Sequence, residues 1–157
     1  MKFVKASPPT KPKTKDSIKV AYFYAAILAI LVLAQLFTFE KFFLLLEDFG
    51  LPGGVPVAHL IGGIIVASEV LALPFLLRLS LSPLMRITSM VLGWVVPAAW
   101  FKLSVWHLIS DSSAVNIGFL GTIVDLSPGW WSVLMSIAMG ILAAWASWGL
   151  WPVKKRK

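Results

Sequence analysis

Two charged residues, Glu69 and Lys102, lie within long apolar stretches of the sequence. A charged side chain near the centre of a bilayer costs at least ~2.5–3.5 kcal/mol on insertion scales, so such residues are functional candidates by default. Glu69 would remain ionised beside a cation, and in apolar surroundings without one it would hold a proton. In that second state it could relay protons or form a hydrogen bond with a quinone or an alcohol.

Lys102 is the first candidate partner for Glu69, because it is the other charge within an apolar stretch. On antiparallel neighbouring helices the two residues would differ by about 10 Å in depth, given the rise of a helix. A lysine side chain reaches along much of that distance, so we expect a direct pair or a bridge through a water or a polar ligand. The alternative is that Lys102 extends to the outer headgroups.

Two histidines, His59 and His107, fall near the outer ends of their apolar stretches, at similar depth. Imidazoles on adjacent helices could ligate haem or a metal ion. However, two histidines without nearby carboxylates or cysteines are a weak metal signal, so we expect interfacial histidines, no metal and no haem. The chain has no cysteine, which excludes thiol redox chemistry and iron–sulfur clusters. No nucleophile motif is present either, so no residue is predicted to be catalytic.

The elements that would position these residues follow from composition. The chain has 157 residues, 59% hydrophobic and 13% charged, with a mean hydropathy of +0.86. Soluble domains are about 45–50% apolar and about 25% charged, which argues against a cytosolic enzyme, a secreted module or a disordered chain. Four apolar segments are long enough to cross the ~30 Å hydrocarbon core: 20–39, 55–77, 87–108 and 130–151. We predict an all-α integral membrane protein whose four transmembrane helices form an antiparallel up-down bundle over residues 20–151.

The distribution of positive charge predicts the orientation of this bundle. Twelve of the fourteen lysines and arginines lie in three segments that an even number of spans puts on one side of the membrane: 1–19, the turn with Arg78 and Arg86, and 152–157. Because Lys and Arg in short loops favour the cytoplasm, we predict that both termini are cytoplasmic. Residues 1–19 would be a flexible basic tail and residues 152–157 a second basic tail. Without an accompanying domain, the first tail does not predict nucleic-acid binding.

The connecting segments carry weaker signals. Residues 40–54 could extend the first span or form a short helix at the membrane interface. Residues 109–129 are predicted to be a polar loop, and Ser127-Pro128 is typical of the N-cap and first residue of the last helix. The spacing of Gly63 and Ala67 favours close contact between helices.

Part of the sequence resembles the DoxX-like family of small bacterial membrane proteins and the related methylamine-utilisation MauE proteins. The residues that carry the resemblance are Lys41-Phe42, Phe49-Gly50-Leu51-Pro52, Ala58, Glu69, Leu71 and Arg78. They cover the first three spans, and the fourth span matches by hydropathy alone. The basic residue and glycine that often open the first span in that family are represented here only by Lys19.

The resemblance implies a four-helix protein of the bacterial cytoplasmic membrane. Some members of the family are associated with redox systems, and one is a subunit of a thiosulfate:quinone oxidoreductase. The resemblance gives Glu69 a functional role and extends one to Lys41, and it implies nothing about His59 or His107. The lack of cysteine argues against a version that acts by dithiol exchange.

We therefore expect an integral membrane subunit or accessory protein of a redox-associated, quinone-facing complex, not an enzyme on its own. Its partners would be the lipid bilayer and either another membrane protein or further copies of this chain, and quinone or lipid is the expected ligand class. One alternative is a small carrier or channel for a polar or amphipathic solute that uses Glu69 and Lys102. Another is a structural assembly factor in which these charges only set helix register.

Overall fold

The computed structural model describes residues 5–110 and 112–151. This part of the chain contains five helices: α1 (Lys15–Phe37), α2 (Phe39–Glu47), α3 (Gly54–Leu76), α4 (Pro83–Ile109) and α5 (Trp130–Leu150). The four long helices overlap the four predicted spans, and each is long and apolar enough to cross a membrane. The prediction of a helical protein with four candidate spans is therefore confirmed, and the chain is a multi-pass membrane protein by this criterion.

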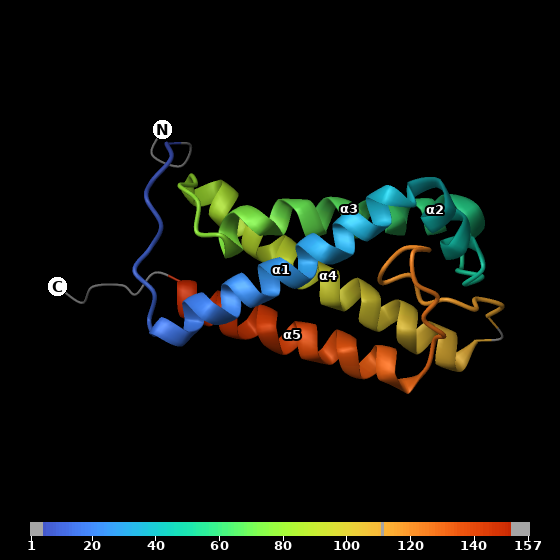
Figure 1. The fold of residues 1–157 in the computed structure, drawn as a ribbon. Coiled ribbons are helices and arrows are strands. Elements are labelled where there is room, and N and C mark those ends of the chain that lie inside the picture. Colours follow the sequence, from blue (N-terminus) through green and yellow to red (C-terminus); the bar gives the residue numbers. More distant parts are fainter. Residues whose placement is uncertain (1–4, 111, 152–157) are drawn as a thin grey trace.

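The four long helices form a bundle in which α1 and α4 each pack against both α3 and α5 (Figure 1). Hydrogen bonds identify which helix ends meet. The backbone N–H of Lys13 donates to the carbonyl of Gly149 at 2.9 Å, and that of Ser7 donates to the carbonyl of Leu81 at 3.1 Å. The start of α1, the α3–α4 turn and the end of α5 thus lie together at one end, which we call the terminal end. The opposite end carries α2, and we call it the α2 end.

Capping residues determine where two of the long helices begin. The side chain of Thr14 accepts a hydrogen bond from the backbone of Ser17, so α1 begins at Lys15, within the segment predicted to be a tail. Ser82 caps α4 in the same way through Met85, and Pro83 occupies the first turn, where its missing N–H costs nothing. Both helices therefore start four or five residues before the apolar runs used to predict them.

A proline lies inside each of α3 and α4, and a neighbouring hydroxyl compensates in each case. Pro97 has no N–H to offer the carbonyl of Gly93, which instead accepts a hydrogen bond from the hydroxyl of Tyr24 at 2.7 Å. Beside Pro74, the hydroxyl of Ser89 accepts from the backbone of Phe75 and donates to the carbonyl of Leu71. These bonds tie α4 to α1 and to α3 at the points where backbone groups would otherwise be unsatisfied.

The segment after α1 turns into a separate helix. Of the two alternatives for residues 40–54, the structure forms a short helix, α2, which buries Phe42, Leu45 and Leu46 against the bundle. Gly62 of α3 makes this packing possible, because a Cβ there would come within 2.7 Å of the Leu46 side chain. Gly63 and Ala67 are exposed, so their predicted contact between helices is not formed within this chain.

The segment between α4 and α5 folds back into the α2 end and buries three apolar side chains, Ala114, Ile117 and Phe119. We call residues 112–129 the long loop. Asn116 organises it, since its amide donates to the carbonyls of Gly121 and Val124 and its oxygen accepts from two backbone N–H groups. The helix start predicted at Ser127-Pro128 is wrong: α5 begins at Trp130, after an extended Gly129.

Residues 5–14 cross the terminal end as an extended segment, which we call the N-terminal strap. Besides the backbone bonds above, the hydroxyl of Thr10 donates to the carbonyl of Leu150 at 2.6 Å. Of the basic tail predicted over residues 1–19, residues 5–14 thus have backbone partners in α5 and the α3–α4 turn, residues 15–19 belong to α1, and residues 1–4 lie outside the described residues. The tail predicted over residues 152–157 lies outside the described residues.

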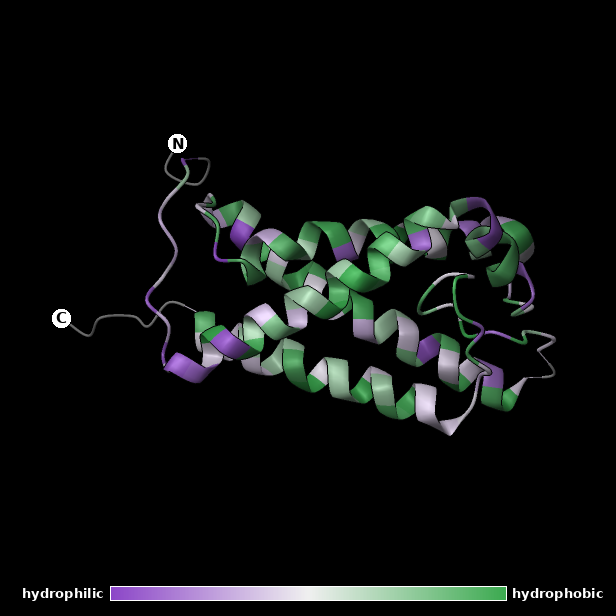
Figure 2. Cartoon of the chain, in the orientation of Figure 1, coloured by the Kyte–Doolittle hydropathy of each residue, from purple (hydrophilic) through white to green (hydrophobic). Residues whose placement is uncertain are grey.

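Figure 2 shows that the middle of each long helix is mostly hydrophobic, while hydrophilic residues gather toward the ends and on α2. Many large apolar side chains face outward, among them Phe23, Ile30, Leu60, Leu134 and Ile141. An apolar exterior of this extent is typical of a surface that faces lipid rather than water.

Candidate functional site

Glu69 is fully buried in the middle of the bundle and is bonded to uncharged partners. Its Oε1 accepts hydrogen bonds from Gln35 Nε2 at 3.2 Å and from Trp100 Nε1 at 3.4 Å. Gln35 Nε2 also donates to the carbonyl of Phe119 at 3.1 Å. We call these four residues the Glu69 network. It joins α1, α3, α4 and the long loop at one point.

Aromatic packing holds the indole of Trp100 in the orientation that this network needs. The ring is fully buried and lies 4.6 Å from the ring of Phe119 and 6.4 Å from that of Phe42, measured between centroids. Gly118 lets the long loop turn closely over it, since this residue has φ 86° and a Cβ would approach Leu45 at 3.1 Å. The loop backbone thereby brings the carbonyl of Phe119 within reach of Gln35.

The Glu69 network has more acceptors than donors. Glu69 Oε2 and Gln35 Oε1 are both buried, and neither has a hydrogen-bond partner among the described residues. A carboxylate only accepts hydrogen bonds, whereas a carboxylic acid also donates one. A proton, or a small donor molecule such as water, would therefore satisfy an oxygen that the protein leaves open. The arrangement suits holding a proton or fixing helix register.

The predicted pair between Glu69 and Lys102 is not formed. Lys102 is exposed on the outer face of α4 and has no ion-pair partner among the acids that the structure describes. The reason is helical geometry: Lys102 follows Trp100 by two residues, and two residues turn a helix by about 200°. Because Trp100 points inward to Glu69, Lys102 must point outward.

Lys102 borders two apolar grooves on the outside of the bundle. One, of about 470 Å³, lies between α3 and α4 and includes Ile61, Ile64 and Trp106. The other, of about 660 Å³, lies between α4 and α5 and includes Pro97 and Gly140, whose missing side chain helps to open it. Neither groove includes Glu69, so the two charges do not share a cavity among these pockets.

The two histidines have separate environments. His59 Nε2 lies 2.7 Å from Glu47 Oε1 at the surface, and its ring contacts that of Phe43 edge-on. His107 packs edge-on against Phe49, and its buried Nδ1 has no partner among the described residues. In the same part of the chain, no group of three or more His, Asp or Glu side chains is arranged to hold a metal ion.

Lys41 is exposed on α2 and lines a shallow hollow with Glu40 and the end of α1. Among the described residues it forms no hydrogen bond or ion pair with the Glu69 network. Of the five residues singled out from the sequence, only Glu69 therefore belongs to that buried network.

The partners of Glu69 were not predicted, although each had a signal in the sequence. Gln35 is the only strongly polar residue of the first span, and Trp100 is a tryptophan well away from the ends of its span. A carbonyl such as that of Phe119 has no signal of its own, because its position depends on how the loop folds.

Comparisons with models of protein families, with curated proteins and with solved structures found no match to this chain.

Proposed function

We propose that this protein is a small integral membrane subunit or accessory protein that works with another membrane protein. The supporting observation is the position of Lys102, a cation on the outward apolar face of α4. α4 is also the least buried of the four long helices. A lysine exposed at this depth is costly in lipid, and an anionic group on a partner helix would offset that cost.

The partner in this proposal is a transmembrane helix that lies along α4. The two grooves beside Lys102 offer apolar surfaces on which its side chains would pack. A carboxylate or a hydrogen-bond acceptor on that helix would meet the ammonium group. Helix association in lipid depends on such close packing and on interhelical hydrogen bonds, because lipid and side chains are equally apolar.

We further propose that the complex is redox-associated and faces the quinone pool of a bacterial cytoplasmic membrane. The support is the resemblance to DoxX-like proteins carried by residues including Lys41-Phe42, Phe49-Gly50-Leu51-Pro52 and Glu69. In this proposal the four spans form an antiparallel up-down bundle with both termini in the cytoplasm, as the lysine and arginine distribution favours.

The carrier hypothesis has less support. It needs Glu69 and Lys102 at one solute site, whereas Glu69 is fully buried and Lys102 faces outward. A structural role for Glu69 within the subunit is better supported, because its network joins three long helices and the long loop. Replacing Gln35 and Glu69 together by Met tests this structural role. If the two residues only fix the helix register, a well-packed apolar pair should preserve the fold and the function of the protein.

The partner surface can be tested by photocrosslinking in native membranes. A photoreactive residue at position 101, beside Lys102 on the exposed face of α4, should capture a distinct membrane protein. The same residue at position 30, where Ile30 of α1 is exposed, serves as the control. Lys102→Gln should reduce co-purification of that protein at least tenfold, while Lys5→Gln, at an exposed position of the N-terminal strap, should leave it unchanged. Equal capture at both positions, or no effect of Lys102→Gln, would contradict the proposal.

The redox part has its own test. Glu69→Gln keeps the size of the side chain and removes its acidity, so it should lower the activity or the assembly of the partner complex. Mass spectrometry of the native preparation should also detect quinone. If activity, abundance and co-purification all match those of the unmodified protein, the functional role of Glu69 is wrong.

A further inference from the structure

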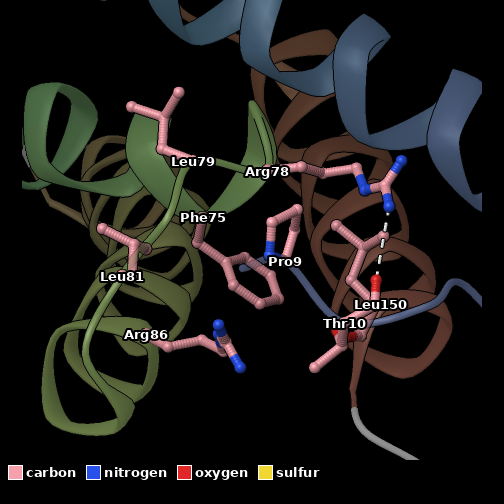
Figure 3. Close-up of a pocket in the computed structure, with 8 residues that line it drawn as sticks. All are labelled: Pro9, Thr10, Phe75, Arg78, Leu79, Leu81, Arg86 and Leu150. Atoms are coloured by element: carbon pink, nitrogen blue, oxygen red, sulfur yellow. Dashed lines mark hydrogen bonds between the residues drawn. The ribbon is translucent and has the colours of Figure 1, made fainter. Parts of the chain in front are cut away.

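Two arginines at the terminal end face the N-terminal strap and have no acidic partner among the described residues. Arg78 donates to the carbonyl of Thr10 at 3.3 Å, and Arg86 donates to the carbonyls of Ser7 and Pro8 at 3.3 and 3.1 Å. Figure 3 shows the Arg78 side chain reaching past Pro9 toward Thr10 and the end of α5, while the Arg86 guanidinium lies on the other side of Phe75. These acceptors are neutral, so they balance none of the charge.

The surroundings leave many of the arginine donors free. Each guanidinium carries five N–H groups, and a bond to one carbonyl uses only one of them. The Nε of Arg78 is buried without an acceptor among the described residues. Arg78 and Arg86 also border the same small hollow of about 10 Å³, whose other walls include Phe75, Leu81 and Leu150. Both cations therefore keep unused donors at this end of the molecule, beside apolar walls.

Charge at the terminal end is almost entirely positive. Within residues 5–110 and 112–151, the acid at this end is Asp16, which is exposed and pairs with Lys19 at 3.4 Å. Lysines of the strap and of the first turn of α1 add to the positive charge: Lys5, Lys11, Lys13 and Lys15. An anion is therefore the complementary ligand for this end of the molecule.

Exposed apolar side chains surround the two arginines. Leu77, Leu79 and Leu84 flank the α3–α4 turn and are between 43% and 59% exposed. A free inorganic ion would not cover them, whereas a lipid would place its phosphate at the guanidinium groups and its chains along these leucines. Guanidinium groups bind phosphate oxygens through paired hydrogen bonds, which gives geometric preference as well as charge.

We propose that Arg78 and Arg86 form a binding site for the phosphate of an anionic phospholipid at the terminal end. Arg86 is only partly buried, so its free donors are accessible from the membrane surface. The strap carbonyls hold both side chains over the end of the bundle, which keeps them ready for the headgroup. Arg86 lies in the first turn of α4 and Lys102 sixteen residues later, so this site is separate from the grooves beside Lys102 and does not depend on the function proposed above.

Native mass spectrometry of the full chain in detergent tests this site. The protein is mixed with phosphatidylglycerol or with zwitterionic phosphatidylcholine, and the lipid that it retains is counted. Phosphatidylglycerol should be retained at least tenfold better. The double variant Arg78→Gln/Arg86→Gln should lose that preference. The matched control Lys5→Gln/Lys11→Gln removes the same charge from exposed strap positions and should keep it.

Three outcomes would overturn the proposal. An equal loss in the lysine control would mean that diffuse charge attracts the lipid. An unchanged preference in the arginine variant would mean that the lipid binds elsewhere. Full displacement of the lipid by millimolar inorganic phosphate would mean a site for a free ion. A second variant, Arg78→Lys/Arg86→Lys, keeps the charge and should retain the fold with a weaker preference, so misfolding of the glutamine variant does not leave the question open.

Discussion

The carboxyl of Glu69 depends on two donors that are themselves uncharged, Gln35 and Trp100. In a low-dielectric interior, removing a donor leaves a buried polar atom without a partner, which costs more than the bond contributes when it is present. The two donors are not equivalent. Gln35 also holds the carbonyl of Phe119, whereas the bond from Trp100 is longer and the ring is held mainly by its aromatic neighbours.

This difference predicts unequal effects of two substitutions. Gln35→Leu takes one of two donors from Glu69 Oε1 and leaves the carbonyl of Phe119 without its donor, so it should lower the free energy of unfolding by about 1–3 kcal/mol. Trp100→Phe keeps most of the aromatic packing and should lower the free energy of unfolding by about half as much. Its cost has two parts: the lost hydrogen bond, for which ~0.6 kcal/mol is typical in membranes, and the smaller buried area of the ring. Unfolding in detergent mixtures, followed by circular dichroism, measures both. A larger loss for Trp100→Phe would show that the indole, not the amide, is the main support of Glu69.

Among the helices, α3 and α4 are joined most directly by Ser89, whose hydroxyl replaces a backbone bond beside Pro74. A proline inside a transmembrane helix frees backbone groups that lipid cannot satisfy, so a neighbouring helix must do so.

The conformation of the long loop depends on close backbone packing at a glycine. At Gly121 the backbone has φ 57° and lies directly against Thr38 and the end of α1.

Ser89→Ala should destabilise the protein by about 1–3 kcal/mol, because the N–H of Phe75 loses its acceptor in the membrane interior. Ser104 provides the matched control. It is also a buried serine of α4, and its hydroxyl has no partner among the described residues. Ser104→Ala should therefore leave the unfolding transition unchanged or raise it slightly. Equal losses for both variants would mean that the hydroxyl of Ser89 does not repair α3.

Gly121→Ala should loosen the long loop, because the new Cβ would come within 2.9 Å of the carbonyl of Ala34. Gly50 has a similar φ of 59° but has no atom within 4 Å of such a Cβ. Gly50→Ala therefore isolates the cost of a left-handed backbone, which is about 1–2 kcal/mol. Hydrogen exchange over residues 112–129 should be faster in Gly121→Ala than in Gly50→Ala. Equal exchange would contradict the prediction that close packing of Gly121 against α1 holds the loop in place.

At the scale of the whole molecule, the number of long helices could be predicted, because an apolar run of this length indicates a transmembrane helix. The inward face of each helix was harder to predict. Lys102 was assigned to Glu69 because both are charged, yet the rotation between Trp100 and Lys102 turns the lysine outward. The apolar run alone does not distinguish the two faces, since lipid and bundle interior are both apolar.

The depth at which residues of different helices meet could not be predicted from the sequence either. If α1 and α3 were level, Gln35 and Glu69 would differ by about 20 Å in depth, counted from the middle of each helix. Their hydrogen bond therefore requires the two helices to be tilted or offset along the bundle, and Figure 1 shows α1 crossing the others at an angle. The long loop meets the same point, because the carbonyl of Phe119 also accepts a hydrogen bond from Gln35. Neither the offset nor the position of the loop can be derived from helix length and hydropathy.

The proposed orientation makes a prediction that this chain is well suited to test, because it contains no cysteine. Single cysteines at Ala6, Ser80 and Ser127 would each be the only thiol, and all three positions are exposed. Ala6 and Ser80 lie at the terminal end, on the side predicted to be cytoplasmic from the positions of Arg78 and Arg86. A thiol reagent that cannot cross membranes should label only Ser127→Cys in intact cells and all three variants after the membrane is opened. Labelling of Ser80→Cys in intact cells would reverse the orientation, and labelling of positions 80 and 127 from one side would contradict the four-span topology itself.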